Sequence, residues 1–454
     1  MMRYFNPRLF VWLLITGLPF QPKTQAQDQA DRIAGNADLI SCLKYALVHQ
    51  PLIRQLQLRD EISRRNVAIA LSDWLPSLDL NAGYQQYLQQ PISIFPDLAN
   101  PSGPKREITT GVKNTSSVLL SANQVIYNPE VIIAGTTAKY YRRQSSQTIQ
   151  ETKIDLVVKV SKAFYDVLLT QARLDFLQED QSRLNKSMND AKSQYESGVN
   201  DKIDYQRALI AFNNIQAEIL GTSEEIKAKK AYLKEIMGYP VESPIAVVYD
   251  SVQMMKDAYL DTTGILHYQN RIEYQLLRTN LYLQKSNVSF YRYGFLPTVS
   301  VYANYNLVYQ NDKLNDLYNR DFPNSSAGVK LTLPLFQGSK RWQQLRRASL
   351  ELKDLQLDTL NLKNRMNTQY EQALASYKSN LKAFLTARGN AQIAYDIYNT
   401  VRLQYNQGIK AYLEVIVSEA DLRTARINEL DALFRLLSSK LDVETALGNI
   451  PVNY

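Results

Sequence analysis

Hydrophobic and polar positions alternate along four short stretches of the chain. In residues 78–84 and 299–309, apolar or aromatic residues occupy every second position and mostly polar residues lie between them. This period is typical of strands with one apolar and one polar face. Residues 329–335 repeat the alternation and 118–127 follow it less regularly. The predicted strands lie at about 77–88, 117–127, 298–310 and 327–336.

Long runs of helix-forming residues separate these strands. Helical segments are predicted at 37–73 and 262–292, each ending before a Leu-Pro pair, because proline disfavours helix in the preceding residue. The 64 residues from 131 to 194 contain one glycine and no proline, so we expect a helix of about 95 Å there. The predicted long helices span 131–197 and 339–407, and the return helices span 199–237 and 409–447.

The last predicted helix carries apolar residues at heptad spacing. They recur in seven-residue steps from Ile409 and from Leu413, which predicts a buried coiled-coil stripe. One interpretation is therefore a non-channel structural coiled-coil protein of the cell envelope. The strands argue against it, because their edges need partners. Four strands are also too few to close a barrel, so membrane strands would have to come from several copies of the chain.

The same pattern occurs twice along the chain. LPSLDLNAGY (75–84) corresponds to LPTVSVYANY (296–305) at an offset of 221, and Tyr195 and Gly198 correspond to Tyr405 and Gly408 at an offset of 210. The offset changes within a loop rich in proline, glycine and asparagine, where exposed loops tolerate insertions. The sequence therefore predicts a tandem duplication. The predicted repeats span 27–250 and 251–454.

Charge and the amino terminus restrict the class of protein. The net charge is +8 over 454 residues, but no basic block occurs, which gives no support to nucleic-acid binding. Residues 1–26 have a positive start, an apolar core and small residues before a cleavage position, the pattern of a signal peptide. No later window is apolar enough over about 18 residues for a transmembrane helix. We therefore expect an exported protein, with no lipid-attachment cysteine after the cleavage position.

Residues suited to catalysis or metal binding are scarce. His49 and His267 lie in separate regions and in no metal-binding motif. No phosphate loop, G-x-S-x-G or CxxC motif occurs. Cys42, the only cysteine, is expected to pack as a small apolar residue. We expect no enzyme activity, no cofactor and no metal site.

The order of these features resembles the TolC-like outer-membrane efflux protein family. The resemblance covers nearly the whole chain after residue 26. It rests on the junctions LPSLDL and LPTVSV, on LPLFQGSK (333–340) before a long helix, and on the paired Tyr-x-x-Gly segments. It implies an α+β membrane protein that forms a homotrimer. Each chain would give four strands to a twelve-stranded β-barrel in outer-membrane lipid, and the helices would form an α-barrel in the periplasm.

The resemblance also implies a function and partners. The trimer would be the passive exit duct of a tripartite efflux or type I secretion system in a Gram-negative bacterium. A periplasmic adaptor (membrane fusion) protein would grip grooves near residues 190–215 and 400–425. The adaptor would link the duct to an inner-membrane transporter of the resistance–nodulation–division (RND) or ATP-binding-cassette (ABC) class. Drugs, metals and proteins remain alternative cargoes.

Within this resemblance, the Tyr-x-x-Gly segments would be the turns at the periplasmic tips. Gly198 and Gly408 suit a helix end, which favours a residue tolerant of positive φ. Glu414 falls where the family places a pore-lining aspartate, so three copies would form a cation-attracting ring. Val417 stands where well-known members have a second aspartate. The resemblance therefore implies a single acidic ring.

Three further residues match the family's gate. Lys410 takes the place of a gate arginine, and Asp204 and Tyr405 match residues that tie the inner and outer hairpins together. Ile203 replaces a hydroxyl residue, and lysine lacks the bidentate fork of arginine. The resemblance thus implies a weaker latch than in the best-known members. The alternative is that Lys410 and Glu414 are ordinary solvated charges.

Overall fold

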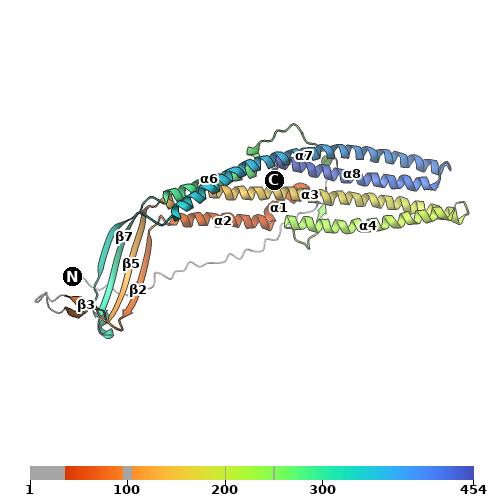
Figure 1. The fold of residues 1–454 in the computed structure, drawn as a ribbon. Helices are drawn as coiled ribbons and strands as arrows, with labels where there is room; N and C mark the ends of the chain where they lie inside the picture. The colour runs from red at the N-terminus through yellow and green to blue at the C-terminus, as the bar shows by residue number, and fades with distance from the viewer. Residues whose placement is uncertain (1–35, 96–104, 200, 249–250) are drawn as a thin grey trace.

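The computed structural model describes residues 36–95, 105–199, 201–248 and 251–454. The expected signal peptide, residues 1–26, lies outside the described residues. A four-stranded sheet lies at one end of an elongated chain, and long helices extend from it to the opposite end (Figure 1). The far end is formed by the turns between α3 and α4 and between α7 and α8.

The helices form two antiparallel hairpins with shorter helices packed beside them. The α-helices are α1 Leu39–His49, α2 Pro51–Ser72, α3 Pro129–Glu196, α4 Lys202–Met237, α5 Ser251–Asp257, α6 Ile272–Tyr293, α7 Lys340–Asn406 and α8 Tyr412–Leu447. The first hairpin is α3 with α4, and the second is α7 with α8. α2 packs on α3, and α6 contacts both α3 and α7. α3 and α7 have 68 and 67 residues, so each is about 100 Å long.

Two predicted helical segments differ from the structure. The segment 37–73 divides at Gln50, whose side chain accepts a hydrogen bond from the Leu52 N–H at 2.8 Å. Pro51 then begins α2, where its missing N–H needs no acceptor. The segment 262–292 becomes helical at Ile272, after the short 3-10 helix η2 Tyr268–Asn270. The prediction of one continuous helix was wrong in both places.

The main sheet joins the two halves of the chain. Its strands are β2 Ser77–Gln86, β5 Asn114–Tyr127, β7 Thr298–Asn311 and β8 Asn324–Thr332, in the order β2-β5-β7-β8. All neighbours are antiparallel, and β5 and β7, one from each half, pair in the centre. β8 ends at Thr332, before the predicted end at 336. Pro334 follows closely, and proline cannot donate to a strand ladder.

Smaller elements complete the fold. β3 Ile92–Phe95 and β4 Arg106–Thr109 form a separate hairpin in the first-half loop, and the 3-10 helix η3 Leu314–Asn319 lies in the corresponding second-half loop. β1 Asn36–Ala37 pairs with β6 Ala246–Val247. None of the helices described has the length and apolar composition that crossing a membrane requires.

The strand register places the apolar positions of the sheet on one face. Leu80 lies opposite Leu120, and Leu120 opposite Tyr305. Val301 lies opposite Val329 in the outer pair. This face is open in the single chain, where Leu80 is 66% and Val329 70% exposed. Among the described strands, β2 and β8 each have only one neighbour in the sheet. The sheet therefore exposes an apolar face and two edges.

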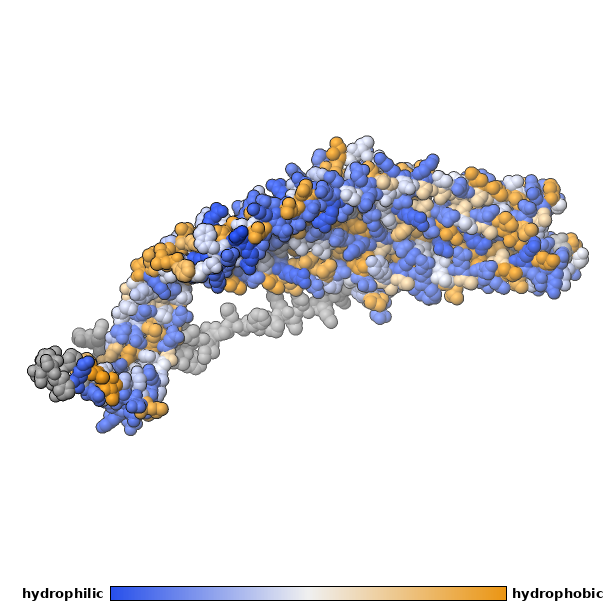
Figure 2. Space-filling model, viewed as in Figure 1, coloured by the Kyte–Doolittle hydropathy of each residue, from blue (hydrophilic) through white to orange (hydrophobic). Residues whose placement is uncertain are grey.

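Apolar residues also gather where the sheet meets the helices. Figure 2 shows this apolar surface, followed by mixed polar and apolar surface along the hairpins. Leu335 and Phe336 are each 88% exposed, and Trp342 is 68% exposed. Leu335 and Phe336 lie between β8 and α7, and Trp342 lies in the first turn of α7. The junction is thus an apolar band in the single chain.

The main core lies near the middle of the molecule, where α1, α3, α7 and α8 meet. Phe164, Tyr377 and Leu436 are fully or almost fully buried there. Cys42 belongs to the same cluster, and burial raises the pKa of its thiol to about 12. The expectation that Cys42 packs as a small apolar residue is confirmed.

The buried stripe of α8 differs from the predicted one. Ile409 and Leu413, from which the heptads were counted, are 67% and 44% exposed in the single chain. Tyr412, Val415 and Leu422 are buried instead. α8 packs on both α7 and α3, so two neighbouring helices decide which residues it buries. The heptad positions are thus exposed near the tip, whereas Leu437, from the series that begins at Ile409, is buried.

The two halves repeat a close backbone contact. A β-carbon on Gly238 would lie 2.9 Å from the His49 carbonyl oxygen, and one on Gly448 would lie 2.9 Å from the Asn270 carbonyl oxygen. Both glycines end a return helix, and both carbonyls lie just before the helix that leads to the sheet. Any side chain at these glycines would displace the backbone that approaches them.

Candidate functional site at the hairpin tips

The two hairpin turns have the same backbone geometry. Gly198 and Gly408 both have a φ of +75°. The Gly198 N–H donates to Tyr195 O at 3.0 Å, and the Gly408 N–H donates to Tyr405 O at 2.9 Å. In each turn the next residue donates to the carbonyl five residues earlier, at 2.9 Å. This is the Schellman motif that closes helices at a left-handed glycine.

Lys410 and Glu414 lie together at the second turn. Lys410 Nζ is 4.0 Å from Glu414 Oε2, and the two side chains are 42% and 55% exposed. Glu414 lies in the first turn of α8, where the helix dipole favours a carboxylate. An exposed ion pair at this separation contributes little to stability. Both side chains are therefore available to solvent or to a neighbouring chain.

Tyr405 joins the second hairpin to the first. Its hydroxyl donates to Gln194 Oε1 at 3.0 Å, and its ring lies 5.5 Å from the ring of Tyr412. Asp204 lies in the first turn of α4 and is half-buried. No hydrogen bond joins the Asp204 side chain to another described residue. The structure thus brings Tyr405 to Gln194, a partner that sequence reasoning missed.

Two further polar contacts continue the link between the hairpins. The Ser187 and Tyr412 hydroxyls lie 2.8 Å apart. The buried carboxyls of Asp180 and Glu419 both lie beside the Arg183 guanidinium. We call these pairs the inter-hairpin seam: Gln194 with Tyr405, Ser187 with Tyr412, and Asp180 with Glu419. Successive members are seven residues apart on both sides. This polar heptad spacing is the signal by which the sequence could have revealed the seam.

The last pair of the seam is a buried cluster of charges. The side chains of Asp180 and Glu419 are 1% and 4% exposed. Arg183 Nη2 donates to Asp180 Oδ1 at 3.0 Å. Arg183 Nε lies 3.7 Å from Glu419 Oε1, and Arg423 Nη1 lies 3.6 Å from Asp180 Oδ2. Burial and the neighbouring Asp180 charge raise the pKa of Glu419 to about 8, against the opposing effect of Arg183 and Arg423.

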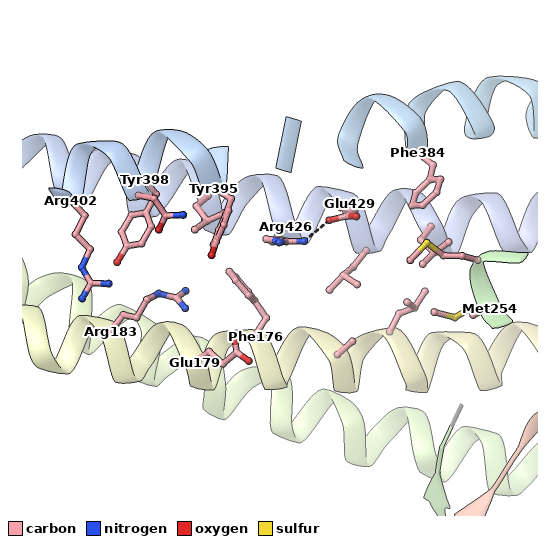
Figure 3. Close-up of a pocket in the computed structure, with 17 residues that line it drawn as sticks. Phe176, Glu179, Arg183, Met254, Phe384, Tyr395, Tyr398, Arg402, Arg426 and Glu429 are labelled. Carbon is pink, nitrogen blue, oxygen red and sulfur yellow. Dashed lines mark hydrogen bonds and ion pairs between the residues drawn. The ribbon is translucent and has the colours of Figure 1, made fainter. Parts of the chain in front are cut away.

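A cavity of about 500 Å³ lies beside this cluster, between α3, α7 and α8 (Figure 3). Phe176, Tyr395 and Tyr398 line it, and Arg183 lies between the rings of Phe176 and Tyr398, 5.7 and 6.0 Å from their centres. Near its middle Arg426 pairs with Glu429 at 3.1 Å, and Phe384 and Met254 lie at the end away from Arg183. The cavity shows that the two hairpins are loosely packed beyond the seam.

Comparison with known proteins shows the family to which the chain belongs. The sequence profile of the outer membrane efflux protein family matches residues 42–239 and 269–449. The chain belongs to this family. Outer membrane protein TolC of Vibrio cholerae is 20% identical over 91% of both chains. Proteases secretion protein PrtF of Dickeya chrysanthemi is 19% identical over 67% of both chains.

Two solved structures have a fold similar to that of this chain. A crystal structure of CusC superposes with a TM-score of 0.73 at 17% identity, covering 92% of this chain and 95% of that one. The outer membrane protein VceC from Vibrio cholerae gives a TM-score of 0.70 at 17% identity, covering 90% and 96%. These structures support the fold. Membership of the family makes this outer membrane efflux protein an exit duct in the outer membrane of a Gram-negative bacterium, with a large helical part in the periplasm.

Proposed function

We propose that three copies of this chain form one gated, passive duct. The open sheet is the observation that carries this proposal. Its four strands leave an edge at β2 and another at β8 and expose an apolar face. Three such sheets joined edge to edge would make a twelve-stranded barrel, which removes the edges and turns the apolar face to lipid. The apolar band at Leu335, Phe336 and Trp342 would then lie near the membrane surface.

The gate of this duct would lie at the tips of the second hairpins. Glu414 would form a ring of three carboxylates, which attracts cations. Lys410 would stand beside it, and Tyr405 would hold the second hairpin to the first. Asp204 would lie at the tip of the outer hairpin. The exposure of Glu414 and Lys410 and the bond from Tyr405 to Gln194 support these roles.

The duct would work with two other proteins and catalyse no reaction. A periplasmic adaptor would grip the tips near residues 190–215 and 400–425, and an inner-membrane RND or ABC transporter would supply the energy. The relatives include both the secretion protein PrtF and the toluene efflux pump protein TtgI of Pseudomonas putida. Either cargo class therefore fits the same duct. No cofactor is needed for passive conduction.

Purification and conductance measurements would test the duct. The protein should extract with outer membranes, have the mass of three chains in detergent and form steady channels in a planar lipid bilayer. A structural coiled-coil protein would instead be released without detergent and would not conduct. A monomeric mass, or a trimer with no conductance under any condition, would overturn the proposal.

A further inference from the structure

Asp180 and Glu419 form a carboxyl pair where α3 of the first hairpin meets α8 of the second. Each carries an oxygen, Asp180 Oδ2 and Glu419 Oε1, that is buried and has no hydrogen-bond partner among the described residues. An ionised carboxylate only accepts hydrogen bonds. Two ionised carboxylates buried beside the same guanidinium therefore leave these oxygens unsatisfied and repel each other, whereas one shared proton removes both problems.

The neighbouring cations do not supply the hydrogen bonds that this proton would supply. Only the bond from Arg183 Nη2 to Asp180 has hydrogen-bond length; the contacts of 3.6 and 3.7 Å are too long. Other titratable groups face the pair from α3, α7 and α8. They are Lys186 and Asp190 from α3, Tyr398 and Arg402 from α7, and Tyr412 and Arg423 from α8. None of the three cations beyond Arg183 makes a hydrogen bond to Glu419 among the described residues.

We propose that Asp180 and Glu419 together bind one proton, and that this proton holds the two hairpins together. With the proton bound, the carboxyl pair joins α3 to α8. Without it, two buried negative charges repel each other and favour the entry of water, so the contact loosens. The inference rests on the proposed gated duct, because the second hairpins must move away from the first for the tips to open.

The position of the pair supports this role. It is the innermost member of the inter-hairpin seam, and the other two members are neutral hydrogen bonds that do not depend on pH in this range. The cavity beside Arg183 leaves space for the side chains and water to rearrange. Among the described residues of the seam, this pair is therefore the only one whose strength a change of pH near neutrality can alter.

The direction of the effect follows from proton linkage. A closed contact binds the proton more tightly than an open one, in which hydrated Glu419 returns toward its ordinary pKa of 4.5 from about 8. Between these values the ratio of open to closed states should rise with pH, by at most about tenfold per unit. It should level off above and below this range. Acid thus closes the contact and alkali loosens it.

Infrared titration of the purified protein tests the proton site directly. Wild type should show a protonated-carboxyl band that disappears with a midpoint near pH 8. Glu419→Gln should lack that band, and so should Asp180→Asn if the first variant does not fold. Glu179→Gln removes an exposed carboxyl beside Asp180 and should keep the band. A wild type without such a band, or the same titration in Glu419→Gln, would overturn the proton site.

Bilayer conductance against pH tests the coupling. Wild type and Glu179→Gln should spend more time conducting as pH rises toward 8, whereas Glu419→Gln should stay mostly closed at every pH. Identical profiles for wild type and Glu419→Gln would overturn the coupling while leaving the duct intact. A titrating infrared band without conductance in any variant would instead overturn the duct, and the coupling with it, but keep the proton site.

Discussion

The Tyr405 hydroxyl donates a hydrogen bond to Gln194 Oε1 at 3.0 Å, and this bond ties the end of the second hairpin to the first. Tyr195 occupies the same place in the first turn, three residues before Gly198. Its ring instead stacks on Tyr205 of its own hairpin, at 6.5 Å. The repeated motif therefore links the hairpins in one direction only, from the second to the first.

Tyr405→Phe should make the duct open more often. The change removes one inter-hairpin hydrogen bond, with a net worth of about 1 kcal/mol, or about a fivefold shift per chain. Single-channel recording at fixed pH measures the fraction of time spent conducting. Tyr195→Phe is the matched control, because its hydroxyl makes no hydrogen bond to a described residue. Equal effects of the two substitutions would contradict this role of Tyr405.

Glu414→Gln should reduce the preference of the duct for cations. The three carboxylates of the proposed ring would be replaced by neutral amides, which attract cations less strongly. The reversal potential under a salt gradient reports this change. Glu196→Gln is the control, since Glu196 is 62% exposed at the first tip and lies 3.9 Å from Lys192 in a similar pair. An unchanged potential in Glu414→Gln would place Glu414 among ordinary solvated charges.

Gly408→Ala should destabilise the protein by about 1 kcal/mol, because alanine is strained at positive φ. Gly389→Ala, within α7, should instead stabilise by about 0.5–1 kcal/mol, because alanine favours helix and has open space there. Thermal unfolding in detergent compares the two variants with wild type. A Gly408→Ala variant as stable as wild type would show that the turn does not need the left-handed conformation.

Tyr377→Phe should destabilise the middle of the molecule by about 1–3 kcal/mol. The buried hydroxyl accepts the Leu260 N–H at 2.7 Å and donates to Ala258 O at 3.1 Å, so its removal leaves two backbone groups without this partner. Tyr370→Phe removes one bond, to Gly264 O at 2.6 Å, from a more exposed site. It should cost less in the same unfolding measurement. A larger loss in Tyr370→Phe would contradict this account.

Much of the architecture can be predicted from the sequence because it depends on local periodicity. α3 was predicted at 131–197 and runs from Pro129 to Glu196, and β7 was predicted at 298–310 and runs from Thr298 to Asn311. Breaks were harder to predict. The residues on both sides of Gln50 favour helix. In the structure α1 ends before Gln50, and α2 begins at Pro51.

The sequence by itself determined the strands, the long helices, the two glycine turns and the family. These depend on the spacing of residues along one segment of chain. The tertiary structure alone decided which face of α8 is buried, that Tyr405 meets Gln194, and that Asp180 and Glu419 are brought together. In the sequence both acids resemble solvated charges on long helices. Their burial arises only where α3 and α8 cross, because the cost of removing a charge from water depends on what surrounds it.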